Sequence, residues 1–176
     1  MKIIEDIKAY SGKSFIKGIY TVLLNSNFQL TFWYRVAHLF YLIHLSLVSK
    51  IIMYFHKLIF SCDIDYRCQI GGGLKIVHGL GIVIGKDVNI GANCSIYKGC
   101  VLGGNGEKSK EYNGRIVTQP QVGNNVSIYS NATILGPVII GDNSIVGAAA
   151  VIMHDVNSNT TVFMKSERCE IIHDSN

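Results

Sequence analysis

An aliphatic residue recurs at every sixth position over much of this chain, and this period limits the folds open to it. The thirteen residues on the repeat are Ile64, Ile70, Ile76, Ile84, Ile90, Ile96, Leu102, Val122, Ile128, Ile134, Ile140, Val146 and Ile152. Glycine directly follows seven of them, at Gly71, Gly85, Gly91, Gly103, Gly123, Gly141 and Gly147. A period of six fits neither the 3.6-residue period of an amphipathic helix nor the alternation of a hairpin strand.

The residue four places after the aliphatic is usually small or short. These residues are Cys68, Val88, Cys94, Cys100, Val126, Ala132, Val138, Ser144 and Ala150. We expect the aliphatic side chain to point into a prism and the shorter residue to fill the remaining space, with glycine easing the turn where a Cβ would crowd it. Three hexads close a circuit of about 18 residues, and circuits stack at about 4.8 Å. The sequence predicts a mainly β protein, a parallel β-helix of slightly more than four circuits.

Two interruptions of the repeat are candidates for a binding site. The spacing between Ile76 and Ile84 is eight, which inserts two residues around His78–Gly81. Between Leu102 and Val122 the spacing is twenty, and the segment 103–121 is polar, charged and glycine-containing. Insertions in repeat proteins form loops on one face, often the binding face, although a neutral decoration is the alternative.

Composition excludes some classes of function. The 176 residues carry a formal charge of +4 with 16% charged residues, and Lys and Arg are scattered, so nucleic-acid binding is not expected. A small anionic ligand fits this charge better. Of the five cysteines, Cys68, Cys94 and Cys100 occupy the small interior position, which predicts reduced, structural thiols in a cytoplasmic protein.

Residues 1–61 differ in kind from the repeat. The stretch 28–60 lacks Pro and Gly and is predicted to be helical, and its longest run without Lys, Arg, Asp or Glu has fourteen residues, too few to span a membrane. No signal peptide is expected. The helices either pack as a pair or lie on a membrane surface with Arg35, Lys50 and Lys57 towards lipid phosphates. We divide the chain into a helical region 1–61, a repeat domain 62–168 with the loop 103–121, and a tail 169–176.

His78 is the strongest catalytic candidate. It lies in an interruption of the repeat, it is followed by glycine at two of the next three positions, and Asp63 precedes it by nearly one circuit. A carboxylate beside a histidine fixes the tautomer and stabilises the ring once it takes a proton.

Several segments resemble the serine acetyltransferase group of left-handed β-helix acyltransferases. They are Asp63-Ile64, Gly71–Gly73, His78–Gly85, Leu102–Gly106 and Ile134–Gly136, and Tyr34–His38 is also similar. The resemblance covers residues 62–168 and extends to polysaccharide-cluster, colanic-acid-type O-acetyltransferases. It implies a left-handed parallel β-helix of hexapeptide repeats with an N-terminal α-helical segment. It also implies acetyl transfer from acetyl-CoA to a hydroxyl, a homotrimer or a dimer of trimers, and sites between adjacent coils.

The resemblance also assigns roles to residues. His78 matches the general base and Asp63 its carboxylate partner, with the family's separation of fifteen residues. The residues matched to acetyl-CoA are Gly103, Gly104 and Asn105 beside the pantetheine, Ser130, Ala148 and Met153 in the groove, and Arg168 at the phosphates. As a basic residue near the end of the repeat, Lys165 is also expected at the phosphates.

Two departures from the family concern the acceptor. Val77 stands where serine acetyltransferases have an aspartate, and Thr118-Gln119-Pro120 stands where they have Arg-His-Pro, so Gln119 is the expected acceptor-binding residue. Lost charge complementarity for a zwitterion costs several kcal/mol. We therefore expect a sugar hydroxyl in exopolysaccharide, capsule or O-antigen biosynthesis as acceptor, with serine O-acetylation as the alternative.

Other functions remain as alternatives. A zinc site like that of β-helix carbonic anhydrases requires three histidines, whereas only His78 is well placed and His154 lies far along the repeat, so no metal is expected. A non-catalytic scaffold would fail to bind CoA. The enzyme is expected in the cytoplasm, with peripheral contact to the inner membrane through residues 28–60 as an open alternative.

Overall fold

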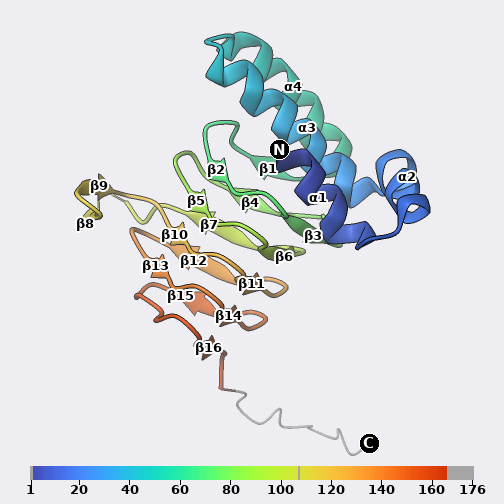
Figure 1. The fold of residues 1–176 in the computed structure, drawn as a ribbon. Coiled ribbons are helices and arrows are strands. Elements are labelled where there is room, and N and C mark those ends of the chain that lie inside the picture. The colour runs from blue at the N-terminus through green and yellow to red at the C-terminus, as the bar shows by residue number, and fades with distance from the viewer. Residues whose placement is uncertain (1, 107, 166–176) are drawn as a thin grey trace, which may run out of the picture.

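The computed structural model describes residues 2–106 and 108–165, which form a three-sided column of stacked coils under a helical cap (Figure 1). Face A contains β1 (Asp63–Ile64), β4 (Val83–Ile84), β7 (Val101–Gly103), β12 (Thr133–Leu135) and β15 (Val151–Ile152). Face B contains β2 (Gln69–Ile70), β5 (Asn89–Ile90), β10 (Gln121–Val122) and β13 (Ile139–Ile140). Face C contains β3 (Lys75–Val77), β6 (Ser95–Tyr97), β11 (Ser127–Ile128), β14 (Ile145–Val146) and β16 (Thr161–Val162).

The interior of the column follows the six-residue repeat. Neighbouring coils pair in parallel with aliphatic residues in register, for example Ile64 with Ile84 and Leu102 with Ile134. All thirteen aliphatic residues are buried, and so are the nine short residues that follow them by four places. The predicted parallel β-helix with an N-terminal helical segment is therefore confirmed. Its core is continuous along the column because each coil buries its apolar surface against the next.

The described residues form five circuits of the column, which corrects the prediction of slightly more than four. After Ile152 the spacing shortens to four residues, so that Val156 forms a parallel bridge with Ile140 on face B. Val162 then pairs with Val146 in β16 on face C. The fixed six-residue count missed the last two sides of this circuit because its first corner is two residues shorter.

Asparagine, rather than the glycine after the aliphatic, supplies many of the left-handed turns. Residues with positive φ include Asn93, Asn125, Asn131, Asn143 and Asn159, and asparagine tolerates this region better than most residues. The Asn125 amide donates to Asn143 (3.0 Å), which donates to Asn159 (3.1 Å).

Five of the seven glycines after the aliphatics are required for a different reason, because a Cβ there would lie less than 3.0 Å from an atom of the neighbouring coil: Gly71, Gly91, Gly123, Gly141 and Gly147. A Cβ added to Gly91 would lie 2.4 Å from the carbonyl oxygen of Gly123, so adjacent coils could not approach as closely as they do. The crowding that we expected at the turn therefore comes from the neighbouring coil.

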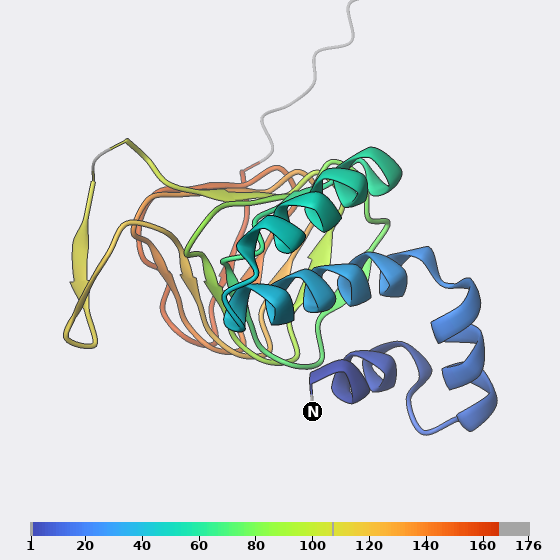
Figure 2. The same cartoon turned by 90° about the horizontal axis from the view of Figure 1, so that it is seen from above.

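The described part of the helical cap consists of α1 (Lys2–Ser11), α2 (Phe15–Leu24), α3 (Ser26–Leu42) and α4 (Ser46–Phe60). Seen from above, α3 and α4 cross the end of the column side by side, while α2 lies beyond its margin (Figure 2). Ser14 and Asn25 cap the N-termini of α2 and α3. The predicted pair of helices corresponds to α3 and α4. In the described ranges, none of the helices has the length and apolar character that a membrane crossing requires.

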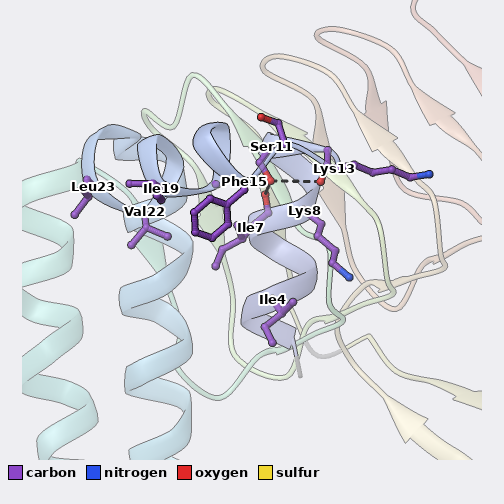
Figure 3. A pocket seen from close by; sticks show the side chains of 12 residues that line it. Ile4, Ile7, Lys8, Ser11, Lys13, Phe15, Ile19, Val22 and Leu23 are labelled. Carbon is purple, nitrogen blue, oxygen red and sulfur yellow. Dashed lines mark hydrogen bonds between the residues drawn. The ribbon is translucent and has the colours of Figure 1, made fainter.

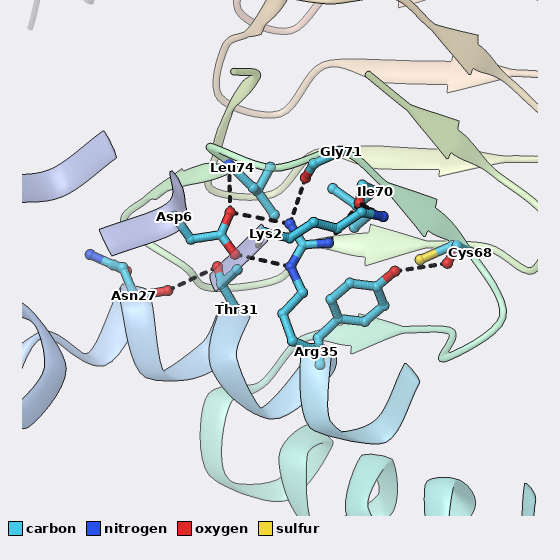
Figure 4. Close-up of polar contacts among 10 residues, drawn as sticks. Lys2, Asp6, Asn27, Thr31, Arg35, Cys68, Ile70, Gly71 and Leu74 are labelled. Carbon is cyan, nitrogen blue, oxygen red and sulfur yellow. Dashed lines mark hydrogen bonds and ion pairs between the residues drawn. The ribbon is translucent and has the colours of Figure 1, made fainter. Parts of the chain in front are cut away.

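Polar side chains of the cap satisfy the backbone of the first coil, which has no coil above it (Figure 4). Tyr34 donates to the Cys68 carbonyl (2.7 Å), and Arg35 donates to the carbonyls of Ile70 (2.6 Å) and Gly71 (2.5 Å). Asp6 accepts from the amide of Leu74 (2.9 Å).

Asp6 also pairs with Arg35 at 2.9 Å, and the two side chains are 1% and 5% exposed. The cap therefore covers the open end of the β-helix, where the strands would otherwise expose unpaired backbone groups as edge strands do. The Tyr34–His38 segment, identified in the sequence through a resemblance, lies within this cap.

Candidate functional site

The two interruptions of the repeat lie on the two edges that flank face A. The chain runs from face C to face A through residues 78–82, which we call the CA edge. It runs from face A to face B in the third coil through residues 104–120, and we call this edge the AB edge. We expected both insertions to form loops on one face, whereas they lie on the two opposite edges of face A.

His78 and Asp63 share the CA edge on adjacent coils. His78 directly follows β3, is exposed and has φ +55°. The next turn stacks on the start of β1, since Gly81 N donates to Ser61 O (2.9 Å) and Asp63 N donates to Ile82 O (2.8 Å). Helix α3 holds the turn, because Gly79 N donates to the side chain of Asn27 (2.8 Å).

The Asp63 carboxylate is held by another partner. Lys57 Nζ lies 2.5 Å from Asp63 Oδ2, and both side chains are more than half exposed. Within residues 2–106 and 108–165, no hydrogen bond joins Asp63 to His78. The fold therefore brings the two backbones to one edge, while the carboxylate contact expected for a catalytic pair is not made in the single chain.

A hollow of about 310 Å³ lies on the AB edge. It is lined by Asn105, Lys108, Lys110, Leu135, Gly136, Pro137, Val138, Met153, His154 and Asp155. Two of the predicted acetyl-CoA residues, Asn105 and Met153, are among them. Gly103 stands beside this hollow, since its carbonyl accepts from Gly136 N (2.9 Å).

Lysines line the hollow, which the sequence analysis did not identify. Lys110 forms an ion pair with Asp155, and the Asp155 carboxylate also accepts from Ile139 N (3.0 Å). Partial burial acts to raise the pKa of Asp155, but these hydrogen bonds, with the charge of Lys110, lower it overall. Lys108 is exposed at the same rim. The hollow can therefore accept an anionic group.

The segment 103–121 contains an antiparallel hairpin of β8 (Lys110–Tyr112) and β9 (Arg115–Val117) that extends away from the column (Figure 2). Its turn, Asn113-Gly114, has positive φ at both residues. Asn-Gly between strand-forming residues signals such a hairpin, and the sequence analysis did not use it.

Gln119 lies at the base of this loop, between two glycines. A Cβ on Gly104 would meet its Nε2 at 2.7 Å, and a Cβ on Gly85 would meet its Oε1 at 3.4 Å. Gln119 Oε1 is buried and has no hydrogen-bond partner among the described residues. Gln119, which was predicted to bind the substrate that accepts the acetyl group, thus has a side-chain oxygen free to accept a hydrogen bond beside Gly104.

The remaining predicted residues lie elsewhere. Ser130 and Ala148 are on the CA edge below His78, where the Ser130 carbonyl accepts from Ala149 N (2.9 Å). Lys165 follows β16 and is exposed, and Arg168 lies outside the described residues. The residues matched to acetyl-CoA are therefore divided between the two edges of face A.

The cysteines of the described part of the chain are buried free thiols: Cys62, Cys68, Cys94 and Cys100. Burial raises the pKa of Cys68 to about 12 and that of Cys94 to about 11, so neither is a nucleophile near neutral pH. In the ranges that the structure describes, no cluster of three or more His, Cys, Asp or Glu is arranged to hold a metal ion.

Similarity to known proteins agrees with the fold. The family described as "Bacterial transferase hexapeptide (six repeats)" matches residues 119–154. A serine acetyltransferase of Synechococcus elongatus is 34% identical over 145 residues, covering 82% of this chain and 57% of the relative. The structure of serine acetyltransferase isoform 3 from Entamoeba histolytica, in complex with cysteine, has a TM-score of 0.84 and 25% identity, covering 98% of this chain and 60% of that one.

A serine acetyltransferase solved in complex with CoA has a TM-score of 0.78 and 25% identity, covering 90% of this chain and 64% of the other. This chain thus spans less than two thirds of the length of these relatives. Its repeat, its fold and these similarities together make the chain similar to the hexapeptide-repeat serine acetyltransferases.

Proposed function

We propose that this protein is an acetyl-CoA-dependent O-acetyltransferase with His78 as its general base. The observation that carries the proposal is the position of His78 and Asp63 on adjacent coils of one edge, in a chain similar to serine acetyltransferases. The neutral His78 ring accepts the proton of the acceptor hydroxyl as its oxygen attacks the thioester carbonyl. The C–S bond then breaks, and the proton passes from His78 to the departing thiolate of CoA.

Asp63 acts on His78 rather than on the substrate. It orients the ring and stabilises the imidazolium that forms during transfer. This role requires its carboxylate to leave Lys57, which costs little because exposed ion pairs contribute at most about 1 kcal/mol. The lysine-lined hollow on the AB edge supplies positive charge for the phosphates of acetyl-CoA. We place the enzyme in the cytoplasm, where buried thiols stay reduced.

The similarity supports L-serine as the acceptor, the alternative of the sequence analysis, better than the sugar that it preferred. A sugar hydroxyl, as in polysaccharide-cluster O-acetyltransferases, remains the second candidate because of the residues expected to contact the acceptor substrate. Val77 and the segment 118–120 carry no charge to recognise an ammonium or a carboxylate. Measuring CoA release with L-serine and with nucleotide sugars or free hexoses separates the two acceptors. Release that depends on a sugar, without release on L-serine, contradicts the first candidate.

The base is tested best with asparagine in place of histidine. Since His78 has φ +55°, alanine would strain the turn, whereas asparagine tolerates this conformation. We expect His78→Asn to lower kcat by about 10²- to 10⁴-fold. His44→Asn is the matched control, because His44 is also exposed, has φ +63° and lies in the turn between α3 and α4. Near-normal turnover in His78→Asn contradicts the assignment.

We further propose that the active enzyme is a cyclic trimer. The candidate base and the lysine-lined hollow lie on two edges of face A, and a ring of identical copies brings one edge of each copy to the other edge of its neighbour. Light scattering should then give about three times the mass of the 19.4 kDa chain.

Mixed oligomers test whether the site is shared. A chain carrying His78→Asn and a chain carrying a disrupted hollow, Lys108→Glu with Lys110→Glu, should each have low activity. Refolded together, they should regain part of it, since some seams combine two intact edges. Mixtures no more active than their components contradict a shared site.

A further inference from the structure

The outer surface of the helical cap is strongly apolar. Its exposed large side chains include Phe15, Ile16, Ile19, Tyr20, Leu23 and Leu24 on α2, and Leu47, Ile51, Tyr54, Phe55, Leu58 and Ile59 on α4. Phe15 and Ile16 are 81% and 79% exposed. Contiguous exposed apolar surface on a folded protein marks a contact with another apolar phase or partner.

Three hollows join these helices into one surface. The hollow between α1 and α2 measures about 820 Å³ and is lined by Ile4, Ile7, Phe15, Ile19, Val22 and Leu23 among others (Figure 3). A second hollow of about 290 Å³ lies between α2 and α3, and a third of about 280 Å³ lies between α3 and α4. Val22 lines the first and second, and Trp33 lines the second and third. We call this continuous region the cap surface.

Every charge that these helices contribute after Asp6 is positive. Residues 7–62 contain no Asp or Glu, and their charged residues are Lys8, Lys13, Lys17, Arg35, Lys50 and Lys57. Arg35 is buried against Asp6, and Lys57 pairs with Asp63. Lys8 and Lys13 line the largest hollow, and Figure 3 shows both side chains directed away from its apolar residues. The cap surface is therefore apolar with a cationic rim.

We propose that the cap surface binds the surface of an anionic phospholipid membrane. Exposed apolar side chains enter the boundary between headgroups and acyl chains, while the lysines contact lipid phosphates. This charge pattern distinguishes a membrane from a second copy of the chain. A two-fold contact through the cap surface would bring lysines of both copies together without carboxylates from residues 7–62, and like charges brought together at an interface oppose association.

Vesicle sedimentation with the full chain tests the proposal, and it needs neither acetyl-CoA nor an acceptor. We expect binding to phosphatidylcholine vesicles containing about 30% phosphatidylserine and much weaker binding to phosphatidylcholine alone, with the difference reduced by salt. Equal binding to both vesicles, or binding to neither, overturns the proposal. Because activity is not measured, this result is independent of the proposed function.

Matched variants locate the contact on the cap. Lys13→Gln with Lys17→Gln should lower partitioning onto anionic vesicles about 25-fold, or about fivefold for each lysine. Lys75→Gln with Lys86→Gln removes the same charge from exposed positions on the column and should change partitioning little. Equal losses in the two double variants overturn the assignment to the cap.

The apolar part is tested by Phe15→Ser with Ile16→Ser, which alters highly exposed residues and should leave the circular dichroism spectrum unchanged. We expect this variant to lose vesicle binding while its mass in solution stays that of the parent. A fall in its mass by light scattering, with vesicle binding retained, would show that the cap surface joins copies of the chain and overturn the membrane proposal.

Discussion

Replacing Arg35 should destabilise the protein more than replacing any exposed charged residue does. Its guanidinium makes four hydrogen bonds, two to Asp6 (2.9 and 3.1 Å) and one each to the carbonyls of Ile70 (2.6 Å) and Gly71 (2.5 Å). Arg35→Gln leaves the buried Asp6 carboxylate without its cation and the Gly71 carbonyl without its donor, whereas the Ile70 carbonyl keeps Lys2 Nζ as a donor (2.8 Å). Breaking a buried ion pair from one side costs about 3–5 kcal/mol.

Thermal unfolding followed by circular dichroism at one protein concentration measures this loss, since assembly would otherwise shift the midpoint. For a chain of this size we expect Tm to fall by about 6–20 °C. Lys57→Gln likewise replaces the cation of an ion pair by a neutral amide, but in the exposed pair with Asp63. The side chains of Lys57 and Asp63 are 61% and 55% exposed. Its expected cost is at most about 1 kcal/mol. Equal Tm values for the two variants would refute the capping role of Arg35.

A second substitution identifies the cause of the loss. Asp6→Asn in the Arg35→Gln background removes the uncompensated buried charge, while the Asn carbonyl can still accept from Leu74 N. We expect it to restore about 1–2 kcal/mol, a coupling typical of contacting residues. If the added substitution costs further stability, an unpaired carboxylate is not the main source of the defect.

Two further predictions concern the column. Because burial raises the pKa of Cys68 from 9.0 to about 12 and that of Cys94 to about 11, the unfolded thiols ionise first as pH rises. Stability is therefore fully present below pH 9 and should fall above it by about 1.4 kcal/mol per pH unit for each thiol. Cys94→Ala should flatten the urea-unfolding profile between pH 9 and 11, and an unchanged slope argues against burial as the cause. Asn143→Gly keeps the left-handed turn, whereas Asn143→Ala adds about 1–2 kcal/mol of strain, so equal midpoints for these two variants would argue against a conformational role.

The six-residue repeat predicted most of the fold because its members are close in sequence and their spacing is regular. An aliphatic side chain every six residues fixed the three faces, and the short residues four places later fixed how the interior fills. The last two sides of the fifth circuit were missed because Val156 follows Ile152 by four residues. The hydrogen-bonded row of Asn125, Asn143 and Asn159 was missed because these side chains do not fill the interior, although they recur at the corner between faces B and C.

The cap could not be predicted in the same way. Asp6 and Arg35 are 29 residues apart, and Arg35 and Ile70 are 35 apart, with no period that relates them. Their contacts depend on how α1 and α3 lie across the first coil, which hydrophobic patterning of residues 28–60 does not determine. The prediction of paired helices therefore identified α3 and α4, but it did not include their packing on the first coil of the column.

The division of the candidate site between two edges could have been found by counting the repeat in threes. His78, Ser130 and Ala148 each lie two residues after an aliphatic of face C, at Ile76, Ile128 and Val146. Met153, like Gly103, follows an aliphatic of face A directly. What counting could not give is the partner of Asp63, because Lys57 reaches it from α4, outside the repeat.

This division has a consequence for assembly. Between the two edges, face A presents Val83, Val101, Thr133 and Val151 in line with Asp63 of β1, so that beyond this one carboxylate it offers one hydroxyl and no charge. Such a surface cannot hold the phosphates of a ligand that runs across it from the hollow to His78. Branched apolar side chains on a strand face are instead suited to burial against another protein surface. The proposed trimer would bring the candidate base and the hollow together across a seam between two copies, with face A covered, rather than across the face of a single chain.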